Sequence, residues 1–188
     1  MYYERAGSRS ATTGVIFGAQ LLEAGVGQYL AIAQTDLGKA VVIDGNGATI
    51  AEMLLPPGPE VSEEQIGAER RRRHDLSNDR ARSRAGLGFP GSTTPFEFRN
   101  LPASRVARPI DRIIGDLDGR LWMRTVRPGE DREHWQVWDI ASAKVEFTVV
   151  LRRAEELLDA AGSLVLVSSK DAFDVDYLLV REIRQGWQ

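Results

Sequence analysis

Three strand-like runs follow one another between residues 116 and 150, and they constrain the fold more than any other part of the chain. The runs are Arg120–Val126, His134–Ile140 and Ala143–Val150. The first connection contains Pro128-Gly129 and three acids, a composition that suits an exposed loop and interrupts a strand. The second, Ala141-Ser142, is short enough for a tight hairpin. Three strands with such short links predict an antiparallel meander.

Two other stretches carry similar signals. Gln28–Gln34 alternates in side-chain character, and Gly45-Asn46-Gly47 between Lys39–Asp44 and Ala48–Leu55 is a strong hairpin signal. Near the C-terminus, Ser163–Ser168 and Val175–Arg184 read as a further pair of strands. We therefore predict antiparallel meanders at residues 28–55, 111–150 and 163–184. These segments form a weak internal repeat, in which the third copy has two strands instead of three.

The remaining segments are harder to assign. Residues 1–12 are expected to be frayed, Thr13–Phe17 could be a short strand, and Leu151–Ala160 could be either a helical turn or a strand. Gly86–Pro109 reads as a loop, with its three phenylalanines anchoring it to the core. The anchors would be Phe89, Phe96 and Phe98.

Glu60–Arg84 differs in character from the rest of the chain and predicts a helix, either in one piece or in two pieces broken near Ser77-Asn78. Ser62 lies three residues before Gln65, which is the spacing of a capping box. The run Arg70–Arg73 invites a nucleic-acid or phosphate interpretation. However, seven arginines face six acids in this segment, so we interpret it as a solvated helix face.

Composition excludes several classes of site. The chain of 188 residues has no cysteine, so it has no disulfide, no thiolate nucleophile and no cysteine-based metal site. A net charge of −3 argues against a nucleic-acid partner, and no run of about 20 apolar residues predicts a membrane span. No phosphate loop, dinucleotide fingerprint or nucleophile elbow is present, so no cofactor is predicted.

The strand motifs resemble a known family. D-x-D-G-x-L-W, then W-x-V-W-D, then D-V-D-Y-x-x-V-R-x-I are similar to the C-terminal blades of bacterial six-bladed β-propellers of the TolB-like and NHL-like kind. The matching residues are Asp116, Asp118, Gly119, Leu121, Trp122, Trp135, Val137, Trp138, Asp139, Asp174, Val175, Asp176, Tyr177, Val180, Arg181 and Ile183. The resemblance spans about residues 25–184. It implies an all-β fold of about two and a half blades, with Glu60–Arg84 as a helical insertion.

This resemblance suggests a division of the chain. It gives an N-terminal segment with a possible edge strand (1–24), a blade (25–59), the helical insertion with its loop (60–109), and a blade followed by an incomplete C-terminal blade (110–188). Because a six-bladed ring needs more residues than these, the chain is expected to be a fragment of a longer bacterial envelope protein, outside the cytoplasm. Open blade flanks also predict self-association when the chain is expressed alone.

The sequence gives only weak indications of metal, catalytic or binding residues. Asp116 and Asp118 could belong to a calcium loop, but Asp-x-Asp-Gly before a strand is more often a turn, and we assign no metal and no catalytic residue. The tryptophans could form a stacking platform or pack between blades. Trp122 and Arg124 share a strand face and are the candidate binding residues. The predicted function is a non-enzymatic binding or scaffold module for an unknown protein or small molecule. The alternative is a fragment of a lactonase-like propeller hydrolase.

Overall fold

The structure is a computed structural model, and its strands and one helix divide into two compact units. It describes residues 2–6, 9–13, 15–86, 101–152, 155–171 and 175–183. One unit comprises Met1–Gly18 with Glu60–Ala107, and the other comprises Ala19–Pro59 with Arg108–Gln188. The predicted all-β class is confirmed, because residues in strands far outnumber residues in the helix in the part of the chain that the structure describes.

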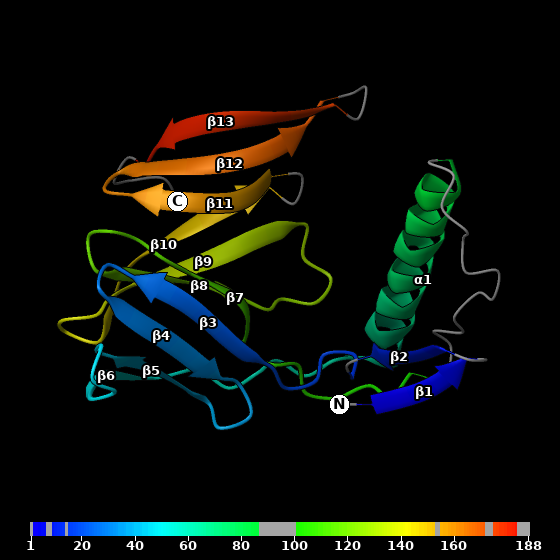
Figure 1. The fold of residues 1–188 in the computed structure, drawn as a ribbon, viewed down its shortest axis with the longest axis horizontal. Coiled ribbons are helices and arrows are strands. Elements are labelled where there is room, and N and C mark those ends of the chain that lie inside the picture. The colour runs from blue at the N-terminus through cyan, green and yellow to red at the C-terminus, as the bar shows by residue number, and fades with distance from the viewer. Residues whose placement is uncertain are drawn as a thin grey trace. The chain divides into compact units, whose positions relative to one another are not determined.

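The second unit consists of three antiparallel sheets, each formed by strands that are consecutive in sequence (Figure 1). The first sheet contains β3 (Leu21–Val26), β4 (Tyr29–Gln34), β5 (Lys39–Ile43) and β6 (Thr49–Leu54). The second contains β7 (Ile110–Gly115), β8 (Arg120–Thr125), β9 (Arg132–Asp139) and β10 (Lys144–Arg152). The third contains β11 (Glu155–Ala161), β12 (Leu164–Lys170) and β13 (Asp176–Glu182).

The three predicted meanders are therefore confirmed, with two changes of detail. The first sheet starts at Leu21, before the stretch assigned to it from the sequence. Glu155–Ala161 is a strand, which settles the ambiguity over residues 151–160 and gives the third repeat three strands instead of two. The segment pairs with β12 through a register shift between Leu157 and Asp159. This bulge breaks the period-2 pattern from which a strand is recognised.

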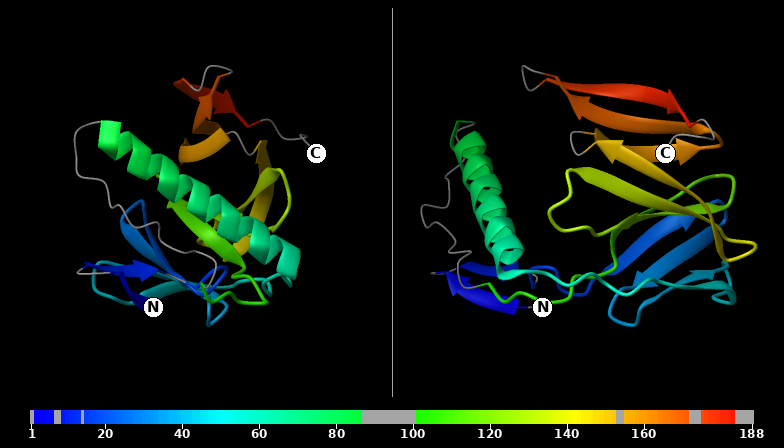
Figure 2. Two further views of the ribbon diagram at one scale, coloured as in Figure 1. Left: turned by 90° about the vertical axis from the view of Figure 1, so that its right-hand side faces the viewer. Right: turned by 180° about the vertical axis from the view of Figure 1, so that it is seen from behind.

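The sheets pack face to face in chain order (Figure 2). Two hydrophobic cores fill the spaces between them. The core between the first and second sheets includes Ala31, Val42, Met53, Leu121 and Met123. The core between the second and third sheets is built on tryptophan, valine and leucine side chains. Its fully buried members are Trp122, Trp135, Val137, Leu157 and Val167. The second sheet is thus covered on both faces.

The other unit is formed by residues 1–18 and 60–107. It contains a hairpin of β1 (Tyr2–Ala6) and β2 (Arg9–Thr13), so the expectation of a frayed N-terminus is wrong. Thr13 ends β2, and Ile16 forms a separate parallel bridge with Ala103. The predicted strand over residues 13–17 is therefore not one continuous element. Ile16 and Leu101 are buried in this unit.

Helix α1 (Glu63–Gly86) begins at the predicted capping box. The Ser62 backbone N–H donates to Gln65 Oε1 over 2.9 Å, and the Gln65 N–H donates to Ser62 Oγ over 3.2 Å. Only Ile66 of the first turns is fully covered, and Arg70 donates to the Leu101 carbonyl over 2.7 Å. The predicted helix is confirmed, and α1 is one piece without the alternative break near Ser77-Asn78.

One further prediction concerns the loop of the long insertion. The phenylalanine anchors proposed for its loop, Phe89, Phe96 and Phe98, lie outside the described residues. Within the described part of the chain, no helix combines the length and the apolar character that crossing a membrane requires.

Candidate functional site

Asp116 lies in the tight turn between β7 and β8 and is almost completely buried. Its Oδ1 accepts the backbone N–H groups of Asp118 and Arg120 over 2.9 and 2.8 Å, and its Oδ2 accepts Trp122 Nε1–H over 3.1 Å. Three N–H donors therefore surround one carboxylate. This is the hydrogen-bonded Asx turn that the sequence favoured over a calcium loop.

Trp122 belongs to the core between the second and third sheets. Its side chain is 0% exposed, and its ring meets Phe147 edge to face at a centroid distance of 5.9 Å. A buried ring cannot stack on a ligand unless the two sheets separate. We therefore assign Trp122 to packing, which was one of the two interpretations of the tryptophans.

Arg124 is held by carboxylates of its own sheet. Its guanidinium pairs with Asp111 over 2.7 Å and with Glu133 over 2.5 Å, and it lies 5.9 Å from the centroid of the Trp135 ring. Burial would lower the pKa of Arg124, but the hydrogen bonds and charges of Asp111 and Glu133 outweigh it and raise that pKa. Trp122 and Arg124 are neighbours, as expected. Ligand contact by Arg124 remains a prediction.

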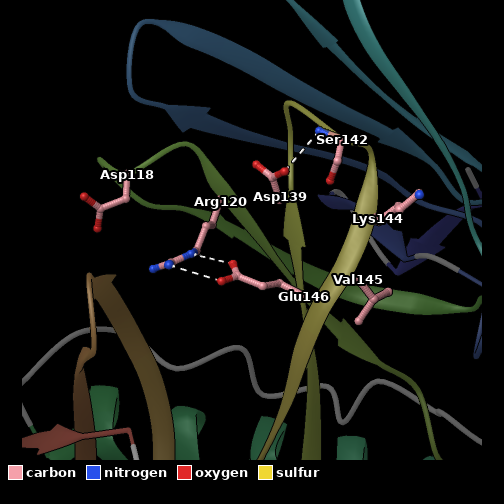
Figure 3. Close-up of a pocket in the computed structure, with 7 residues that line it drawn as sticks. All are labelled: Asp118, Arg120, Asp139, Ser142, Lys144, Val145 and Glu146. Atoms are coloured by element: carbon pink, nitrogen blue, oxygen red, sulfur yellow. Dashed lines mark hydrogen bonds and ion pairs between the residues drawn. The ribbon is translucent and has the colours of Figure 1, made fainter. Parts of the chain in front are cut away.

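A polar pocket with a volume of about 380 Å³ opens beside the start of β8 and the β9–β10 turn (Figure 3). Three carboxylates (Asp118, Asp139 and Glu146), two cations (Arg120 and Lys144), Ser142 and Val145 line it. Most of these groups already have partners in the fold. Arg120 pairs with Glu146 over 2.8 Å, and this hydrogen bond raises the pKa of Arg120.

Two residues of this pocket also join the second sheet to the third. Asp118 Oδ2 accepts the backbone N–H of Gly162, and Arg120 Nη1 donates to the Gly162 carbonyl over 3.1 Å. The backbone N–H and C=O groups of Gly162, in the β11–β12 turn, are thus both hydrogen-bonded to side chains at the β7–β8 turn. The Arg120 guanidinium additionally lies 5.8 Å from the centroid of the Phe147 ring. The polar surroundings of the pocket therefore serve the packing of the sheets.

Asp139 and Asp44 have equivalent roles in two repeats. Asp44 Oδ1 accepts the N–H groups of Asn46 and Ala48, each over 2.9 Å, after β5. Asp139 accepts the N–H groups of Ala141 and Ser142 over 3.2 and 3.0 Å, after β9. The backbone donor Ala48 is the largest cause of a lowered pKa at Asp44, and Ser142 is the largest cause at Asp139.

Sequence reasoning missed most of these contacts. The pairing of Arg124 with Asp111 and Glu133 joins three strands and has no local signal. The same holds for Glu155 of β11, a buried acid that pairs with Arg181 of β13. In the described ranges, no group of three or more histidine and carboxylate side chains could hold a metal ion.

Comparison of the chain with protein-family models, curated proteins and solved structures finds no match. The resemblance to TolB-like and NHL-like propellers consequently stays a prediction, and the geometry of the described residues is the remaining guide to function.

Proposed function

We propose that the chain is a non-enzymatic binding or scaffold module, built from three consecutive blades of a β-propeller. The propeller assignment is supported by the repeated strand order, in which β3, β7 and β11 each begin a meander. It is also supported by the packing of each sheet on the next one in the chain. Propellers repeat meanders of this kind around a central axis.

The observation that carries the binding function is the outer face of the third sheet. Three large apolar side chains there are exposed: Leu164 by 47%, Leu178 by 64% and Val180 by 68%. Leu166 lies opposite Val180 in the register and on the same face. An exposed apolar face rimmed by charge is typical of a protein-interaction surface. The polar side chains discussed above are, by contrast, engaged in internal contacts.

A peptide selection tests this proposal. The chain is immobilised at low density, so that its copies cannot meet, and is presented with a random phage-displayed peptide library. We expect enrichment of apolar, strand-forming peptides that bind the wild-type chain and fail to bind a Leu178→Lys/Val180→Lys variant. The matched control is Leu117→Lys, which changes a leucine that is 85% exposed in the β7–β8 turn.

The hydrolase alternative has a separate test. Purified chain is incubated with simple lactones and added Ca²⁺, and hydrolysis is followed by the acid released. The binding proposal expects the uncatalysed rate. Hydrolysis well above that rate, together with no peptide enriched on the third sheet, would overturn it.

A further inference from the structure

We name the two faces of each sheet by direction along the chain. The preceding face lies on the side of the sheet before it and the following face on the side of the sheet after it, and at the two ends of the stack no described sheet covers the outer face. The second strand of each sheet shows the alternation. The turn before this strand is closed by Tyr29 in the first sheet, Arg120 in the second and Leu164 in the third. Two residues further along lie Ala31 in β4, Trp122 in β8 and Leu166 in β12, which are therefore equivalent positions. All three belong to following faces. Ala31 packs toward the second sheet and Trp122 toward the third, whereas no described sheet covers Leu166.

The strand partners of these residues are three valines with different environments. Ala31 pairs with Val42, Trp122 with Val137, and Leu166 with Val180. Val42 and Val137 are 0% exposed, but Val180 is 68% exposed. The third sheet thus has a valine at the position where the first and second sheets bury one, but its valine is exposed.

The opposite end of the stack has the complementary feature. Leu30, Leu121 and Val165 occupy equivalent positions on the three preceding faces. Leu121 is 0% and Val165 is 3% exposed, each covered by the sheet before it. Leu30 is 39% exposed, beside its strand partner Ile43. The stack therefore ends in one open following face and one open preceding face.

We propose that the partner for each open face is a second copy of this chain, with the third sheet of one copy packed on the first sheet of the other. The argument is continuity, because the contact repeats for a third time the packing that already occurs twice within the chain. This inference rests on the proposed binding function and names its partner.

Two copies of the chain can cover both open faces of each copy at the same time. If each third sheet packs on the partner's first sheet, the dimer has two identical contacts and no open face. Six sheets then form one closed ring, and propeller rings typically contain about four to eight blades. Each contact joins a following face to a preceding face, and the proposed ring closes when the rotation from one sheet to the next completes a circle in six steps.

Complementation between two full-length variants tests this geometry. Val180→Lys damages the following face of the third sheet, and Leu30→Lys damages the preceding face of the first. We expect the wild-type chain to sediment at twice its 20.8 kDa mass. Each variant alone should be a monomer, whereas an equimolar mixture should recover dimers, because one of its two contacts joins undamaged faces. Leu117→Lys should dimerise like the wild type.

Cross-linking identifies the faces directly, because the natural chain has no cysteine. Leu30→Cys and Val180→Cys each introduce a single thiol. A short bis-maleimide should join the two variants in a mixture at least tenfold more than it joins either variant to itself. Thermal unfolding of every variant, monitored by circular dichroism, checks that the fold is retained.

Several results would overturn the inference. They are a wild-type monomer at all concentrations tested, efficient cross-linking of the Val180→Cys variant to itself, or a mixture of the two lysine variants that stays monomeric. If the wild-type chain is monomeric but the selected peptides still bind the third sheet, the choice of partner fails and the binding function stands. If both experiments fail with folded protein, the binding function fails as well.

Discussion

Gly115 of β7 lies so close to Gly25 of β3 that a Cβ atom on Gly115 would be 2.1 Å from the Gly25 carbonyl oxygen. The same atom would be 2.3 Å from Val26 Cγ2. A Cβ on Gly25, by contrast, would meet nothing within 4 Å. The close approach of β3 and β7 therefore leaves no room for a side chain on Gly115, whereas Gly25 has open space where its side chain would be.

This asymmetry predicts opposite effects for two equivalent substitutions. Gly115→Ala should destabilise the fold by about 1–3 kcal/mol, the usual range for overpacking, because a backbone oxygen has little room to move. Gly25→Ala should be neutral or stabilise slightly, since it only restricts the unfolded chain. Urea unfolding of both variants measures the difference. Equal midpoints for the two variants would contradict the close approach of β3 and β7.

Trp122→Ala should cost about 3–5 kcal/mol, the range found on removing a large aromatic side chain from a core. It also removes the N–H that donates to Asp116 Oδ2. Trp122→Phe is the matched control, because it keeps an aromatic ring and removes that donor. It should cost less than the alanine variant. A loss below about 1 kcal/mol for Trp122→Ala in denaturant titration would mean that this side chain is exposed.

The Arg124 pairs should behave as one coupled network. Arg124→Gln leaves Asp111 and Glu133 without their cation, so it should destabilise the fold. Asp111→Asn removes one acid, and the double variant should lose less than the sum of the two single variants. A double-mutant cycle should give a coupling energy of about 0.5–3 kcal/mol. Simple additivity would show that the ion pair contributes nothing to folding.

The two hairpin acids give a prediction for pH dependence. The pKa of Asp44 and that of Asp139 are both lowered from an ordinary value of 3.8. A lowered pKa in the folded state means that each carboxylate stabilises the fold at pH above that ordinary value. This contribution is lost as pH falls through the folded-state pKa. Asp44→Asn and Asp139→Asn should each lower the urea midpoint at pH 7.

The same two variants should approach the wild type in acid. Asparagine keeps an oxygen acceptor for the turn but has no charge, so the difference in urea midpoint should shrink steadily as pH falls below about 4. Because the two aspartates have equivalent positions, both curves should have the same shape. A difference that is constant from about pH 7 to about pH 2.5 would contradict a role for the carboxylate charge.

The capping box at the start of α1 allows one further test. Ser62→Ala should cost about 0.5–2 kcal/mol, since it removes the acceptor for the Gln65 N–H. Ser62→Thr keeps that acceptor and should cost less. Helical content measured by circular dichroism during thermal unfolding separates the two variants. If the alanine variant unfolds like the threonine variant, the reciprocal bonds do not hold the start of the helix.

The local parts of this fold were predictable from the sequence. The hairpin at Gly45-Asn46-Gly47, the turn at Asp116–Gly119 and the capping box at Ser62 are each set by a few neighbouring residues with a known conformational preference. The period-2 alternation of Gln28–Gln34 is likewise a local pattern.

The parts that were missed depend on distant partners. Residues 155–161 contain a bulge and two adjacent acids, and their pairing with β12 defines them as a strand. Helix α1 continues through Ser77 and Asn78, where local propensity favoured a break. The candidate site shows the same limit. Trp122 and Arg124 were correctly placed together on one face, but Phe147 and Glu133, which contact them, come from β10 and β9.

The antiparallel bridge between Glu60 and Val106 has a consequence for the order of folding. It brings together two points that are far apart in the sequence, just after the first sheet and just before the second. The Val61 N–H reinforces it by donating to the Arg105 carbonyl over 2.8 Å. Once this pair has formed, the entropy of closing the long loop has already been lost, and the second sheet can find the first as though joined by a short connection. Changing the loop length between the bridged residues should consequently alter the folding rate only weakly, because closure entropy grows with the logarithm of length.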